Sequence, residues 1–202
     1  MMAQVSETTN GIPQIFASII TIGDELLIGQ VVDTNSAWMA QELNKAGIWL
    51  RRRVAVGDNR EEIIQALNEE SRYASIILIT GGLGPTADDI TKPVLCEYFN
   101  GKLVIDEGAL ANVESIFARL NRPMIERNRK QAEVPDTCTV IPNKRGTAPG
   151  MWFERDGKVF VSMPGVPHEM KGMMTNYVIP KLQGHFTFPF IDHRTLLTAG
   201  IG

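Results

Sequence analysis

Short apolar runs alternate with amphipathic segments along most of the chain. Buried strands are predicted at 15–22 and 75–79, where β-branched and other apolar residues are concentrated, and a strand with alternating apolar residues is predicted at 48–56. Between these runs, apolar residues such as Met39 and Leu43 recur at helical spacing, which predicts helices. Strands that alternate with helices favour the α/β class, with a mostly parallel sheet covered on both faces. Ligands of such sheets bind at the carboxyl ends of the strands.

Polar residues at the segment boundaries indicate where the helices begin. Thr34 or Asn35 is predicted to cap the helix after the first strand, because either side chain can accept a hydrogen bond from an unpaired N–H group. Asn59 and Glu62 have the spacing of a capping box for the next helix. Asp106 is predicted to open a later helix.

The last third of the domain has a different pattern. Segments 151–154 and 158–161 flank Asp156-Gly157, and this dipeptide favours the tight turn of a β-hairpin. A helical stripe follows, whose methionines fit core packing better than a ligand platform. This helix is predicted to end near Pro180.

The chain divides into three parts. Residues 1–14 are predicted to be a flexible leader, in which Asn10-Gly11 and Pro13 break any regular element. Residues 15–182 form the α/β domain. Residues 183–202 are expected to begin a linker or a second domain, because a new extended run starts at His185. A fragment or a short form of a longer polypeptide is therefore expected.

Composition limits the classes of function. The 202 residues, 44% hydrophobic and 21% charged, can bury one α/β domain. The formal net charge of −3 argues against general nucleic-acid binding, and no apolar run reaches membrane-spanning length. The basic cluster Arg51–Arg53 fits a solvated strand face, with substrate or partner binding as the alternative. Cys96 and Cys138 form no metal-spaced pair, and no signal peptide is indicated, so the expected location is the cytoplasm.

The run 80–92, TGGLGPTADDITK, carries the strongest chemical signal. It follows a predicted buried strand, and its glycines let an anion approach the main-chain N–H groups closely. A helix that starts just beyond would add the positive end of its dipole. Asp88 and Asp89 would repel a bare phosphate but can hold a divalent cation that bridges to it. The run therefore predicts a metal-assisted phosphate or diphosphate site. The alternative is a structural turn with a capping aspartate.

Six blocks together resemble one family. Their order and spacing are similar to the N-terminal domain of the CinA competence/damage-inducible family, part of the molybdopterin-binding MoaB/Mog-like superfamily. The blocks that carry the resemblance are 21–30 with 33–35, 55–59, 81–92, 128–132, 146–150 and 164–170.

The resemblance implies a three-layer α/β/α sandwich and a hydrolase. The expected reaction is divalent-metal-dependent hydrolysis of a nucleoside diphosphate linkage, with ADP-ribose cleaved to AMP and ribose 5-phosphate. The expected cofactor is Mg²⁺, Mn²⁺ or Co²⁺, with a monovalent cation as a further candidate. The implied partner is a small nucleotide, without nucleic acid or membrane, and the chain is expected to form a homo-oligomer, a dimer. Alternatives are molybdopterin binding or adenylylation and a non-catalytic nucleotide-binding module.

The candidate catalytic groups are acids and one lysine. Asp58 and Asp89 are the first candidates for positioning metal or water, with Asp88 as a further metal ligand. Lys92 is the candidate for stabilising the leaving phosphate. Three of these four residues have a structural alternative: Asp58 as a helix cap, Asp88 as a solvated neighbour and Lys92 as an exposed helix lysine.

The candidate substrate-binding residues form a larger set. Leu83 stands where the molybdopterin enzymes have a hydroxyl residue, which weakens a pterin assignment. Glu169 either points at the ligand or complements the dipole of the helix that it begins. The full set is Gly23, Asp24, Glu25, Gly81, Gly82, Leu83, Gly84, Thr86, Thr147, Gly150, Pro164, Gly165 and Glu169. His168, His185 and His193 lack metal-ligand spacing.

Overall fold

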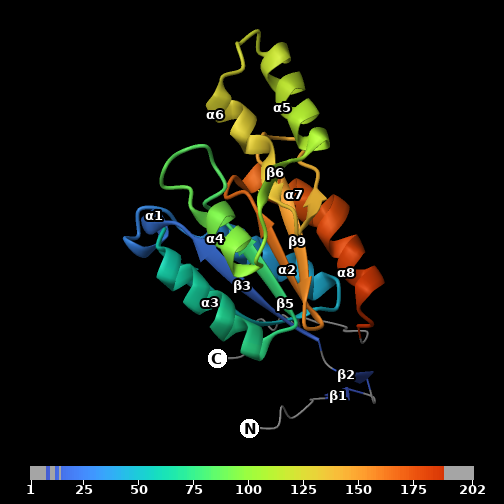
Figure 1. Cartoon of the computed structure of the whole chain (residues 1–202). Coiled ribbons are helices and arrows are strands. Elements are labelled where there is room, and N and C mark those ends of the chain that lie inside the picture. The colour runs from blue at the N-terminus through green and yellow to red at the C-terminus, as the bar shows by residue number, and fades with distance from the viewer. Residues whose placement is uncertain (1–7, 10–11, 14, 189–202) are drawn as a thin grey trace, which may run out of the picture.

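A six-stranded sheet forms the centre of the protein. The computed structural model describes residues 8–9, 12–13 and 15–188 (Figure 1). Four neighbouring strands pair in parallel and two more are added antiparallel, so the predicted mostly parallel sheet is confirmed. In spatial order the strands are β4 (Trp49–Val56), β3 (Phe16–Ile22), β5 (Ile76–Thr80), β10 (Lys158–Met163), β9 (Gly150–Arg155) and β8 (Thr139–Ile141).

Helices cover both faces of the sheet (Figure 1). Alternate side chains of β5 point to opposite faces: Leu78 packs in a core that includes Met39 and Met170, whereas Ile79 packs in a core with Leu67 and Leu95. The three-layer α/β/α sandwich is therefore confirmed. The first face carries α2 (Thr34–Lys45), α7 (Pro167–Met173) and α8 (Ile179–His185), and the second carries α3 (Arg60–Tyr73) and α4 (Thr91–Tyr98).

A smaller unit extends beyond one end of the sheet (Figure 1). Strands β6 (Leu103–Ile105) and β7 (Glu133–Pro135) pair antiparallel. Between them in the sequence lie α5 (Glu107–Arg119), α6 (Glu126–Arg129) and the short 3₁₀ turn η1 (Lys130–Ala132). The Asp106 carboxylate accepts a hydrogen bond from the Ala109 N–H at 2.7 Å, which confirms that Asp106 opens α5.

The predicted cap of α2 is wrong by one or two residues. Asp33 is the cap, because its carboxylate accepts hydrogen bonds from both the N–H (2.9 Å) and the hydroxyl (2.5 Å) of Ser36. Asn35 instead donates from its side-chain nitrogen to the Gly165 carbonyl at 2.7 Å. This contact joins two segments that are far apart in the sequence.

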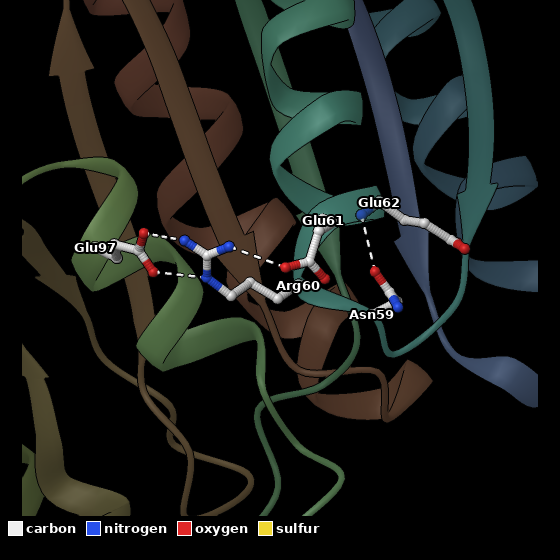
Figure 2. Close-up of polar contacts among 5 residues, drawn as sticks. All are labelled: Asn59, Arg60, Glu61, Glu62 and Glu97. Carbon is white, nitrogen blue, oxygen red and sulfur yellow. Dashed lines mark hydrogen bonds and ion pairs between the residues drawn. The ribbon is translucent and has the colours of Figure 1, made fainter.

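The predicted cap of α3 is confirmed. The Asn59 side chain accepts a hydrogen bond from the Glu62 N–H at 3.1 Å (Figure 2). The reciprocal half of the capping box is absent, because the Glu62 carboxylate accepts instead from the Gly57 N–H at 3.3 Å.

An ion-pair group links α3 to α4. Figure 2 shows the Arg60 guanidinium between the carboxylates of Glu97 and Glu61. Its Nε donates to Glu97 at 2.8 Å, a second nitrogen contacts the other Glu97 oxygen, and Nη1 donates to Glu61 at 3.1 Å. The contacts with Glu97 bridge α3 and α4, which follow the loops after β4 and β5, whereas Glu61 lies on α3 with Arg60.

The C-terminal elements follow the prediction in part. The β-hairpin is confirmed, with Asp156 and Gly157 at positive φ in the turn between β9 and β10. The helix does not end near Pro180, because a π-helical turn at Met174–Val178 widens the backbone before the proline, and α8 continues to His185. The predicted boundary at 182 thus lies inside a helix.

The predicted leader contains some regular structure. Strands β1 (Thr8–Thr9) and β2 (Ile12–Pro13) pair antiparallel, so the expectation of no regular element is wrong for these residues. His193 and the other residues of 189–202 lie outside the described part. In the described ranges, no helix combines the length and apolar character needed to span a bilayer.

Candidate functional site

A pocket of about 470 Å³ lies at the carboxyl ends of β3, β4, β5 and β10. This is the switch point of the sheet, where the chain leaves β3 toward β4 on one side and later returns to β5 on the other. The loops after β3 and β5 therefore meet at one edge (Figure 1). Of the residues predicted to bind substrate, the lining includes Gly23, Glu25, Gly81, Gly82, Leu83, Gly84, Thr147, Pro164, Gly165 and Glu169.

Two glycines let the loop after β5 pass closely against its neighbours. Gly81 has φ +113°, and a Cβ there would lie 2.1 Å from the Ile22 carbonyl oxygen. Gly82 has φ +62°, and a Cβ there would lie 2.1 Å from Thr91 Oγ1. No larger residue fits either position without movement of the backbone or of Thr91. α4 begins at Thr91 rather than directly after the glycines.

The loop offers fewer free donors than predicted. The Gly81 N–H donates to the Met163 carbonyl at 3.2 Å, and the Gly84 N–H donates to Asp89 at 2.8 Å. Among the residues that the structure describes, none accepts a hydrogen bond from the N–H groups of Gly82 or Leu83. Of the four N–H groups from Gly81 to Gly84, two are therefore left to bind a phosphate in this arrangement. The Leu83 side chain is buried in the core with Leu67 and Leu95, so it brings no polar group to the pocket.

Asp89 lines the pocket and organises its own loop. Its carboxylate accepts hydrogen bonds from the N–H groups of Gly84 (2.8 Å) and Thr86 (2.9 Å) and from the Thr86 hydroxyl. The carboxylate thus takes donors that were predicted for phosphate. A bound metal or phosphate would have to add to these contacts or replace them. Asp88 also lines the pocket.

Asp58 lines the pocket from the loop after β4. Its carboxylate accepts from the Asp24 N–H at 3.1 Å, while the Asp24 carboxylate accepts from the Asp58 N–H at 3.1 Å. Burial raises the pKa of Asp58, and the negative charges of Asp24, Glu25 and Asp88 raise it further. The alternative in which Asp58 caps α3 is wrong, because Asn59 fills that position.

Another part of the pocket lining comes from the loop before β9 and from the first turn of α7. The Glu169 carboxylate accepts from Asn143 Nδ2 at 2.6 Å, and a Cβ on Gly146 would lie 2.1 Å from the Glu169 carboxyl carbon. The Thr147 hydroxyl donates to Gln131 Oε1 at 3.2 Å. Gln131 is buried and lines the pocket, although it is not among the residues predicted for the site. Its place in the block 128–132 was the available signal.

Four predicted site residues lie outside the pocket lining, namely Asp24, Thr86, Lys92 and Gly150. The Lys92 ammonium donates to the carbonyls of Lys130 (3.1 Å) and Gln131 (3.3 Å), and burial lowers its pKa. The Lys92 ammonium is therefore engaged outside the pocket lining, and its predicted contact with a leaving phosphate stays a prediction. The alternative of an exposed helix lysine is wrong, because Lys92 is buried. Gly150 lies in the hydrogen-bonded ladder with β8 and faces Met173.

The basic cluster has structural partners. Arg52 forms ion pairs with Glu69 (3.0 Å) and Glu70 (3.3 Å), and the Arg51 guanidinium lies 4.2 Å from the centre of the Phe16 ring. These contacts favour the interpretation of this cluster as a strand face over substrate binding.

Carboxylates are numerous around the pocket, but they do not converge. Within the described residues, no three side chains of histidine, cysteine, aspartate or glutamate form a group able to hold a metal ion by themselves. The acids in the lining are Glu25, Asp33, Asp58, Asp88, Asp89 and Glu169. A divalent ion would need oxygen ligands from a bound molecule or water in addition to these acids.

Comparisons with known proteins agree with this fold. A family model described as probable molybdopterin binding domain matches residues 18–184. A CinA-like protein of Cytophaga hutchinsonii is 50% identical over 188 residues, which cover 93% of this chain and 45% of that protein. The chain thus spans less than half the length of this relative.

Solved structures give the same result. The crystal structure of the protein CinA with unknown function from Thermoplasma acidophilum matches with a TM-score of 0.73 and 34% identity, over 83% of this chain and 97% of that one. The tungsten cofactor synthesizing protein MoaB from Pyrococcus furiosus matches with a TM-score of 0.56 and 17% identity, over 85% and 97%. The second match shows a shared fold.

Proposed function

We propose that this chain, which belongs to the probable molybdopterin binding domain family and to its CinA-like members, hydrolyses a nucleoside diphosphate linkage in the pocket described above. The observation that carries the proposal is the unpaired N–H groups of Gly82 and Leu83 in a pocket that Asp58 also lines. Amide donors suit phosphate oxygens, and a carboxylate suits an attacking water molecule.

The donor set fits a hard divalent cation held together with a diphosphate. Mg²⁺ is usually bound by one or two carboxylates, substrate phosphates and water rather than by a complete protein cage. Asp58 is the first candidate ligand, with Glu25 and Asp88 close enough for their charges to affect its pKa. A bound Mg²⁺, Mn²⁺ or Co²⁺ would neutralise phosphate charge and lower the pKa of water. A monovalent cation remains a further candidate.

The residues of the chain have distinct tasks in this proposal. Gly82 and Leu83 hold phosphate oxygens through their N–H groups. Asp58, whose pKa is raised, orients water and accepts its proton. The water oxygen forms a bond to one phosphorus, and the bond from that phosphorus to the bridging oxygen breaks. With ADP-ribose the products are AMP and ribose 5-phosphate.

Molybdopterin binding or adenylylation is the second candidate. The comparisons support it more directly than hydrolysis, because the description of the matched family names molybdopterin. Against it stands Leu83, which brings no hydroxyl group to the glycine loop. A non-catalytic nucleotide-binding module is the third candidate.

Product analysis separates these candidates. The full chain is incubated with ADP-ribose, NAD, FAD or CoA and each divalent ion, and in parallel with ATP and molybdopterin. We expect metal-dependent AMP from ADP-ribose. An adenylylated pterin without AMP from any dinucleotide would favour the second candidate, and ligand binding without turnover the third.

Two further expectations concern the oligomeric state of the protein and its location. We expect a homodimer, which light scattering would test by mass. The two free thiols, Cys96 and Cys138, suit a reducing compartment such as the cytoplasm.

A further inference from the structure

Exposed apolar side chains gather on one wall of the pocket. Val31, Val32 and Val166 are 50%, 79% and 52% exposed, and all three line the pocket. We call these three residues the valine wall. A single exposed valine needs no explanation, but three around one cavity indicate apolar surface that a ligand can cover.

The valine wall is held in place by polar contacts. Val31 and Val32 directly precede Asp33, whose carboxylate is fixed by the N–H and hydroxyl groups of Ser36. Val166 directly precedes α7 and follows Gly165. The 2.7 Å hydrogen bond from Asn35 to the Gly165 carbonyl joins the two segments. The wall is therefore positioned before any ligand binds, and its side chains are not packed into the core.

The pocket is consequently polar at one part and apolar at another. The N–H groups of Gly82 and Leu83 and the acids offer partners to phosphate and cation, whereas the valines offer only van der Waals contact. Beside the wall, Asn35 Oδ1 is buried and accepts no hydrogen bond from the described residues. The volume of about 470 Å³ lies within the usual range for small-molecule sites.

We propose that the valine wall binds the flat heteroaromatic ring of a phosphorylated ligand, while the glycine loop binds its phosphate. This inference rests on the ligand-binding part of the proposed function and makes it more specific. The ring gains apolar contact with the valine side chains. A second copy of the chain is a less favoured occupant, because the wall is continuous with the phosphate-binding part of the same cavity.

Binding measurements with two probes test this inference. Dissociation constants of AMP and of pyrophosphate are measured by calorimetry for the full chain and for Val32→Ser and Val166→Ser. Ile28→Ser is the matched control, because Ile28 is 76% exposed and four residues from Val32 but does not line the pocket.

The expected result is selective. Val32→Ser and Val166→Ser each weaken AMP binding about fivefold, as expected for loss of apolar contact, and leave pyrophosphate binding unchanged. Ile28→Ser changes neither. Unchanged AMP binding in both valine variants, or an equal loss for both probes, would overturn the inference. A change of molecular mass in the valine variants without a change in AMP binding would also overturn it and indicate an interface between copies.

The outcome is distinguishable from failure of the hydrolysis proposal. If the valine variants selectively lose AMP binding but the wild-type protein does not cleave ADP-ribose, the ring subsite is supported and the hydrolysis proposal is rejected. If the wild-type protein cleaves ADP-ribose but the valine variants bind AMP normally, the hydrolysis proposal is supported and the ring subsite is rejected.

Discussion

Asp24 and Asp58 exchange hydrogen bonds, each backbone N–H donating to the carboxylate of the other at 3.1 Å. The pair joins the loop after β3 to the loop after β4, which lie next to each other in the sheet. Each charge is partly compensated by an amide donor, so two acids can lie close together at the edge of the pocket. Asp58 lines the pocket, whereas Asp24 does not.

Substitutions of Asp58 separate its charge from its hydrogen bond. Asp58→Asn keeps an oxygen that can accept from the Asp24 N–H, so we expect its free energy of unfolding to stay within about 0.5 kcal/mol of wild type. Asp58→Ala loses the acceptor and should lower that free energy by about 1–2 kcal/mol. Urea unfolding measures both values. Equal destabilisation by the two variants would show that the exchanged hydrogen bonds do not act as described.

Asp89→Ala should loosen the glycine loop. The substitution removes the acceptor of the Gly84 and Thr86 N–H groups, so these amides should exchange their hydrogens faster, by about tenfold or more. Hydrogen exchange followed by NMR measures the effect, with amides of β5 as an internal control. Unchanged exchange at Gly84 and Thr86 would contradict the role that we give to Asp89.

Lys92→Met should destabilise the protein through the pocket wall. The carbonyls of Lys130 and Gln131 would lose their donor, and we expect a loss of about 2 kcal/mol in the free energy of unfolding. Thermal and urea unfolding give this value. A variant as stable as wild type would show that the two hydrogen bonds contribute little.

The same variant tests a pH dependence. Burial lowers the pKa of Lys92 from 10.5, so the unfolded chain binds more protons than the folded chain between the lowered pKa and 10.5. The free energy of unfolding of wild type should therefore rise with pH in this window, relative to Lys92→Met. Urea unfolding of both proteins at a series of alkaline pH values measures the difference. A difference that does not change with pH contradicts the lowered pKa.

Cys138 should react slowly with thiol reagents. Burial raises its pKa to about 12, so only a small fraction is thiolate at pH 8. We expect slow labelling by iodoacetamide in the folded protein and rapid labelling in denaturant. Cys138→Ser provides the control that assigns the signal. Fast labelling of Cys138 at pH 8 without denaturant would contradict the raised pKa.

Local patterns predicted those features that neighbouring residues determine. The Asp156-Gly157 turn, the Asn59 and Asp106 caps and the glycine loop after β5 all depend on residues a few positions apart. The same reasoning placed the cap of α2 incorrectly, because Asp33, Thr34 and Asn35 are all capable of capping and only the contacts of the folded chain decide between them.

The spacing of residues in the sequence did not predict contacts between distant segments. Nothing near Lys92 indicates that its ammonium binds the Lys130 carbonyl, and nothing near Gln131 indicates that it lines the pocket. Asp89 shows a related difficulty. An acidic residue in a glycine-rich loop suits a metal or the loop's own N–H groups equally well, and only the folded geometry shows which donors it meets.

The most direct test of the central claim is hydrolysis of ADP-ribose in ¹⁸O-labelled water with a divalent ion, followed by mass spectrometry of the products. We predict AMP and ribose 5-phosphate as products, with one ¹⁸O atom in the phosphoryl group of one of the two. The rate of hydrolysis should be at least about 100-fold lower for Asp58→Asn than for wild type. Absence of labelled product from wild type with Mg²⁺, Mn²⁺ and Co²⁺, or equal rates for wild type and Asp58→Asn, would contradict it.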